Sequence, residues 1–141
     1  MTLGRTKSID ILVSNPSTDQ MYQLEVKANL NRRKQPFSVS KLFGRIVSNW
    51  RMHEKHEFIS RPKLWYCFVT FGLESNVARF FIVPSAVVAG YVRAEHRLFL
   101  DTTPKGKDVA TRNFRIGFEG EKYRIPTPTA EQYEDNWDFK L

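Results

Sequence analysis

The chain has 141 residues, a length that fits one domain. Hydrophobic residues make up 41% and aromatic residues 13% of it, which is enough for a packed core and excludes a disordered chain. Lysine and arginine total 22 against 15 aspartate and glutamate, so the net charge is +7. This excess favours nucleic acid as a partner, although a basic surface without a polyanionic ligand has the same composition.

The only cysteine, Cys67, lies in the apolar run from 64 to 69. Its apolar neighbours predict a buried thiol. A single cysteine cannot form an internal disulfide, so we expect a reducing compartment. The first residues lack the apolar segment of a signal peptide, and no apolar stretch approaches the ~20 residues that a membrane span needs. We therefore expect a cytoplasmic protein without a membrane partner.

A β-hairpin is predicted near the N-terminus. Residues 8–14 are apolar and β-branched, which indicates a strand. Turn-forming residues follow at 15–19. From 21 to 28 apolar and polar residues alternate, which is the period of a strand with one polar face.

A helix is predicted over residues 38–55, after a polar loop at 29–36. Apolar residues recur there at helical spacing, and Ser38 or Ser40 could cap the first turn. The members of this apolar set are Leu42, Phe43, Ile46, Val47 and Trp50.

The rest of the chain predicts strands, a helix and a tail. The expected elements are strands at 64–71 and 79–83, a helix at 85–98, a loop at 101–110 and a last strand at 113–118. This order indicates an α/β fold with a mixed sheet. We expect one domain over 1–141, with about 119–141 as a C-terminal extension anchored by Tyr133 and Trp137.

The hairpin register predicts a polar site on one face. If Ser14 lies opposite Met21, then Asp10 lies opposite Glu25, and Lys27 shares their face. Two carboxylates at that spacing repel each other unless a cation joins them, and Mg²⁺ prefers oxygen ligands. An exposed face on which Glu25 pairs with Lys27 or with Lys7 is the alternative.

Asp10, the hairpin turn and Glu25-Val26-Lys27 resemble the motif of the PD-(D/E)xK nuclease superfamily. This is the restriction-endonuclease-like fold, shared by archaeal-type Holliday junction resolvases and many small prokaryotic proteins. The resemblance implies a mixed β-sheet flanked by helices, with Mg²⁺ (or Mn²⁺) held by Asp10, Glu25 and the backbone carbonyl of Val26. It makes Asp10, Glu25 and Lys27 the catalytic residues of a phosphodiester hydrolase.

The same resemblance implies DNA as the favoured nucleic acid and a homodimer as a possible assembly. The family's core begins with a helix and a strand, whereas only seven residues precede the predicted strand that carries Asp10. We therefore expect the family's first helix and strand to be missing from this chain.

Basic residues flank the predicted hairpin. The loop cluster Arg32-Arg33-Lys34 and the pair Arg5 and Lys7 are predicted to hold nucleic-acid phosphates, with a solvated loop as the alternative.

Two other features favour ordinary structural roles. The histidines of the run 53–57 do not form His-Glu-x-x-His, and we expect them at an exposed helix end, with His96 on another helix surface. The aromatic residues of 65–81 are expected to form core rather than a base-stacking platform. Three functions stay open: a metal-dependent nuclease, a non-catalytic nucleic-acid-binding module on the same fold, and an interaction domain with an incidental basic surface.

Overall fold

The computed structural model describes residues 11–32, 34–35, 37–106 and 108–141. It is a mixed α/β fold built on a mixed four-stranded sheet. The elements are β1 (Ile11–Asn15), β2 (Gln20–Asn31), β3 (Ser38–Ser40), β4 (Gly44–Ile46), β5 (Ser48–His53), the 3₁₀ helix η1 (Glu54–Glu57), β6 (Leu64–Gly72), β7 (Val77–Pro84), α1 (Ser85–Thr102), β8 (Thr111–Ile116) and α2 (Ala130–Tyr133).

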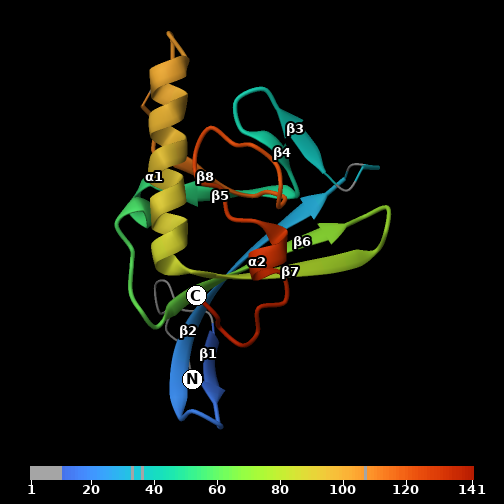
Figure 1. The fold of residues 1–141 in the computed structure, drawn as a ribbon, viewed down its shortest axis with the longest axis vertical. Coiled ribbons are helices and arrows are strands. Elements are labelled where there is room, and N and C mark those ends of the chain that lie inside the picture. The colour runs from blue at the N-terminus through green and yellow to red at the C-terminus, as the bar shows by residue number, and fades with distance from the viewer. Residues whose placement is uncertain (1–10, 33, 36, 107) are drawn as a thin grey trace, which may run out of the picture.

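The central sheet has the strand order β1-β2-β6-β7 (Figure 1). β2 pairs with β6 in parallel, whereas β1–β2 and β6–β7 are antiparallel. Residues 64–68 of β6 are all buried, as expected for a strand that is covered on both faces. The continuous apolar run in the sequence was therefore a correct signal for a central strand.

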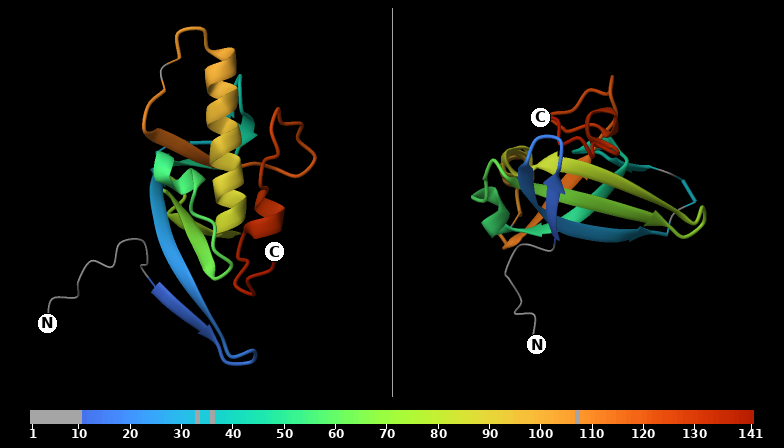
Figure 2. Two further views of the ribbon diagram at one scale, coloured as in Figure 1. Left: turned by 90° about the vertical axis from the view of Figure 1, so that its left-hand side faces the viewer. Right: turned by 90° about the horizontal axis from the view of Figure 1, so that it is seen from below.

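The β1–β2 hairpin extends away from the body formed by α1, β5 and β8 (Figure 2). Its turn is held by the Asn15 side chain, whose Oδ1 accepts a hydrogen bond from the Ser17 N–H at 3.0 Å. Ser14 pairs with Met21, so the predicted register is confirmed for the described part of β1. The first described pair of the ladder is Ile11 with Leu24.

The helix predicted over 38–55 is wrong. This segment forms β3, β4 and β5, followed by η1. In β5 the side chains of Trp50 and Met52 are buried while Arg51 between them is exposed, which is the period of a strand. Gly44 has a φ of +77°, a left-handed conformation that ends any helix at this point.

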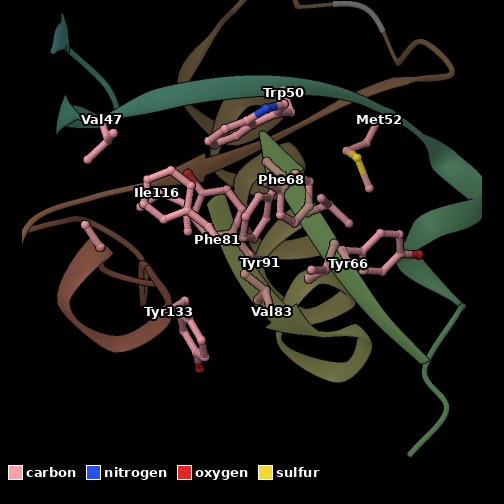
Figure 3. Packing of buried hydrophobic residues seen from close by; sticks show 14 residues of the cluster. Val47, Trp50, Met52, Tyr66, Phe68, Phe81, Val83, Tyr91, Ile116 and Tyr133 are labelled. Atoms are coloured by element: carbon pink, nitrogen blue, oxygen red, sulfur yellow. The ribbon is translucent and has the colours of Figure 1, made fainter. Parts of the chain in front are cut away.

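β5 pairs with β8 and, together with α1, covers one face of the central sheet. Trp50 and Met52 point from β5 toward Phe68 and Tyr66 of β6 (Figure 3). The Trp50 indole N–H also donates to the Val69 carbonyl at 2.8 Å. The aromatic residues of β6 and β7 on this face are therefore core, as predicted.

The opposite face of the sheet carries a smaller apolar cluster that includes Trp65, Cys67 and Ile82. Cys67 is buried, so it is a core residue, as predicted, and its burial raises the pKa of the thiol to about 11. Phe139 from the C-terminal tail covers the cluster, stacking on Tyr22 at 4.4 Å between ring centroids.

The anchors of the C-terminal tail differ in part from the prediction. Tyr133 is buried, as expected, but 49% of Trp137 is exposed. Phe139 supplies the second buried contact instead. Glu134 adds a bidentate ion pair with Arg79 of β7, at 2.6 and 2.9 Å.

The helix predicted at 85–98 is confirmed as α1, although it continues to Thr102. His96 on this helix is buried rather than on its surface, and its Nε2 lies 2.8 Å from Asp108 Oδ1. Within the described part of the chain, neither α1 nor α2 is both long and apolar enough to cross a membrane.

Candidate functional site

Glu25 lies in the middle of β2 and points to the sheet face that β5 and α1 cover. Glu25 is only 6% exposed. Its direct neighbour across the parallel ladder is Tyr66 of β6. Lys27, two residues farther along the strand, projects on the same side. The Lys27 Nζ lies 2.8 Å from Glu25 Oε1, so the two side chains form an ion pair.

His56 completes the surroundings of the carboxylate. It lies in η1 and is 3% exposed, so the expectation of an exposed helix end is wrong for this residue. Its Nδ1 accepts the His53 N–H at 2.9 Å, and its Nε2 lies 3.8 Å from Glu25 Oε1. That separation exceeds hydrogen-bond length.

Three buried polar atoms of this cluster have no hydrogen-bond partner in the described structure. They are Glu25 Oε2, His56 Nε2 and the Tyr66 hydroxyl. The rings of His56 and Tyr66 lie 6.1 Å apart, and Tyr66 neighbours Glu25 in the sheet. An unpaired buried polar group costs about 1–3 kcal/mol, so three in one place mark a site rather than ordinary core.

The site keeps Glu25 ionised. Burial alone would raise the pKa of the Glu25 carboxyl, but His56 and Lys27 act in the opposite direction and hold it below its usual value. Burial raises the pKa of Tyr66 well above its usual range, and the Glu25 charge adds to the effect. At neutral pH the cluster therefore combines a carboxylate with a protonated phenol.

Two adjoining surface pockets open beside Lys27, and Arg51 of β5 lines both of them. One has a volume of about 350 Å³ and is lined by Lys27, Arg51, Met52, His53, Lys55 and His56. The other, of about 360 Å³, is lined by Lys27, Ala28, Asn29, Asn49, Trp50, Arg51 and Asn113. Cationic side chains line the first pocket and asparagine side chains the second, a lining suited to phosphate oxygens.

The predicted metal ligands are only partly within the described chain. Asp10 lies outside the described residues. Glu25 is placed as described above, and Val26 follows it in β2 with its side chain in the smaller apolar cluster. The described residues contain no group of three His, Cys, Asp or Glu side chains that could hold a metal ion.

Of the residues predicted to bind phosphates, only Arg32 and Lys34 belong to the described part of the chain. Arg5, Lys7 and Arg33 lie outside the described residues, whereas Arg32 and Lys34 are exposed. β2 continues to Asn31, so Arg32 lies about 17 Å from Lys27 at ~3.3 Å per strand residue. Neither Arg32 nor Lys34 lines the two pockets beside Lys27.

The sequence contained only partial signals for this region. Arg51 was a weaker phosphate-binding candidate that was placed, like Lys55, on a predicted helix, although polar and apolar residues alternate in 48–53 as in a strand. His56 carried no local signal, because its neighbour Glu25 lies 31 positions earlier in the chain. Tyr66 was correctly placed in a strand, but its pairing with Glu25 depends on the parallel register.

No protein-family model matches the chain, and no match is found among curated proteins or solved structures. What the chain does is therefore inferred from the residues of this site and from the resemblance of its motif.

Proposed function

We propose that the chain is a metal-dependent nuclease with Glu25 and Lys27 at its centre. The observation that carries the proposal is the buried Glu25 carboxylate, which keeps one oxygen unpartnered and pairs with Lys27, a residue that lines two surface pockets with cationic and amide side chains. The mixed sheet with this pair on an inner strand supports the resemblance to the restriction-endonuclease-like fold.

One atom of the described site, Glu25 Oε2, fits a hard divalent cation. Glu25 Oε2 is buried and without a partner, and a carboxylate oxygen is a ligand that Mg²⁺ and Mn²⁺ prefer. By resemblance, Asp10 and the Val26 carbonyl would join Glu25. A bound cation would supply an activated water and neutralise charge on the phosphate oxygens.

The chain's own side chains would bind and orient the substrate. Lys27 lies between Glu25 and the two pockets, so its ammonium can contact a phosphate oxygen and stabilise charge that develops on it. Arg51 would hold a neighbouring phosphate from β5. DNA as the substrate, and a homodimer that acts on it, are the predictions that the resemblance adds.

Calorimetric titration of Mn²⁺ tests the proposal. We expect wild type to bind Mn²⁺, and an Asp10→Asn/Glu25→Gln variant to bind none. Cleavage of duplex, single-stranded and branched DNA would then be screened with both proteins. A wild type that binds no Mn²⁺ and cleaves none of these substrates refutes the nuclease.

A non-catalytic nucleic-acid-binding module is the second candidate, and one observation favours it. Lys27 already compensates the Glu25 charge at 2.8 Å, as a structural ion pair would. In that case Arg51→Gln and Lys27→Gln weaken DNA binding, and the Asp10→Asn/Glu25→Gln variant binds DNA as wild type does. The carboxylate variant separates this candidate from the nuclease. Retention assays at several salt concentrations separate it from an interaction domain with an incidental basic surface, because phosphate contacts release counterions.

A further inference from the structure

His56 has a hydrogen-bonding pattern that orients its ring toward Glu25. Its Nδ1 lies 2.9 Å from the His53 N–H, which can only donate, and 3.0 Å from the His53 carbonyl. Of these two contacts the N–H is the shorter and needs a lone pair on Nδ1, whereas the carbonyl would need a proton there. We assign the lone pair to Nδ1, which places the proton of a neutral ring on Nε2. Nε2 is the atom that lies 3.8 Å from Glu25 Oε1.

We propose that His56 is a positioning residue, whose Nε2–H faces Glu25 Oε1 across 3.8 Å and binds that oxygen when a ligand occupies Oε2. This inference rests on the proposed function and adds a residue to its site. It assigns a role to a buried histidine that the motif does not contain. A small closure of the 3.8 Å gap would complete the hydrogen bond when the site is loaded.

The surroundings of Glu25 support this division of its two oxygens. Lys27 and His56 both approach Oε1, at 2.8 and 3.8 Å, while Oε2 has no partner. Tyr66 neighbours Glu25 in the sheet, and its hydroxyl also has no partner. The described protein groups therefore leave one oxygen of the carboxylate uncommitted.

The η1 turn holds His56 firmly enough for this role. The His53 N–H binds the His56 ring, and His53 Nδ1 in turn accepts the Lys55 N–H at 3.3 Å. These reciprocal contacts form a capping box around a single turn. Arg112 of β8 pairs with Glu57 at 2.5 Å and ties the same turn to the core.

A long-range ¹H–¹⁵N spectrum of the wild type at pH 8 tests the placement of the proton without metal or substrate. We expect the Nε2–H tautomer for His56, with Nδ1 unprotonated. A proton on Nδ1 would overturn the proposal, because the ring would then present a lone pair to a carboxylate.

Metal binding and kinetics test the role itself. In His56→Leu we expect the Mn²⁺ Kd to rise by about tenfold or more, and kcat to fall with KM unchanged, because partners that orient a ligand contribute that much. His56→Gln, whose amide can donate as Nε2–H does, should recover most of both. The matched control is His96→Leu, which removes the other buried histidine near a carboxylate and should leave the Mn²⁺ Kd unchanged.

The outcomes separate the two proposals. If wild type binds Mn²⁺ and folded His56→Leu binds it equally well, the role of His56 is refuted and the nuclease stands. If wild type itself binds no Mn²⁺, the proposed function is refuted, and the positioning role with it. If His56→Leu does not fold, the His56→Gln titration and the wild-type tautomer decide.

Discussion

Glu25 and Tyr66 are direct neighbours on the parallel strands β2 and β6, and each has a buried oxygen without a hydrogen-bond partner. Proteins tolerate such groups where a ligand uses them, at a cost in stability. The position of the pair in the sheet thus brings two buried oxygens without hydrogen-bond partners close to the ion pair between Lys27 and Glu25.

Removal of the Tyr66 hydroxyl should not destabilise the protein. Tyr66→Phe deletes a buried group without a partner, so we expect an unfolding free energy equal to wild type or higher by up to about 1 kcal/mol. Urea denaturation measures this difference. The control is Tyr123→Phe, which should lose about 1 kcal/mol, because the Tyr123 hydroxyl accepts from the Phe118 N–H and donates to the Arg45 carbonyl.

Lys27 should matter for cleavage far more than for folding. Its side chain is 28% exposed, so Lys27→Ala should fold, and we expect a loss of about 10²–10³-fold in kcat. Cleavage rates at saturating substrate measure the loss. Lys140→Ala serves as the control, since that side chain is 80% exposed at the C-terminal end. Equal rates for wild type and Lys27→Ala would remove Lys27 from the mechanism.

Arg51 should contribute to binding rather than to chemistry. It lines both pockets beside Lys27, so Arg51→Gln should raise the Kd for DNA and lower the salt slope by about 0.9, the value for one phosphate contact. Fluorescence anisotropy between 50 and 200 mM salt, as a convenient range, measures the slope. The same slope in both proteins would place the phosphates elsewhere.

Glu25 should make the folded state sensitive to acid. Its folded pKa lies below the usual value of 4.5, so its stabilising contribution is present above that pH and is lost as the pH falls through the folded pKa. Wild type should therefore lose more stability than Glu25→Gln on acidification below about pH 4.5. Urea denaturation from pH 6 to pH 3 checks this, with exposed Glu74→Gln as control. Parallel curves for wild type and Glu25→Gln would contradict it.

Phe139 of the C-terminal tail should stabilise the protein by covering the smaller apolar cluster of the sheet. This ring is 9% exposed and packs against Tyr22 and Trp65, so Phe139→Ala should cost about 3 kcal/mol. Trp137→Ala, at a residue 49% exposed, should cost less than about 1 kcal/mol. Thermal and urea unfolding would rank the two variants. The reverse order would restore Trp137 as the anchor of the tail.

Local periodicity was sufficient for several parts of the fold. The alternation in 21–28 and the turn formers at 15–19 predicted the hairpin and the register that the described pairs show. The apolar run at 64–71 and the helical spacing after Pro84 predicted β6 and α1. In these segments the sequence pattern fits one type of element only, and the structure contains that element.

The segment 38–55 shows why local pattern can fail. Its apolar residues fit helical spacing, yet Trp50 and Met52 also fit a strand with polar residues between them. The choice was made by β8, whose residue Phe114 pairs with Trp50 from 64 positions later. The local pattern fits both elements, so the distant pairing partner decides between them.

The sequence alone determined the composition of the site, a carboxylate and a lysine two residues apart on one face of a strand. Only the tertiary structure decided that His56 and Tyr66 surround this carboxylate, and that Arg51 lies beside Lys27. The physical reason is that a strand's period is set by its own backbone. Burial and neighbours are set by whichever element packs on the sheet, here the β5–β8 pair and the η1 turn.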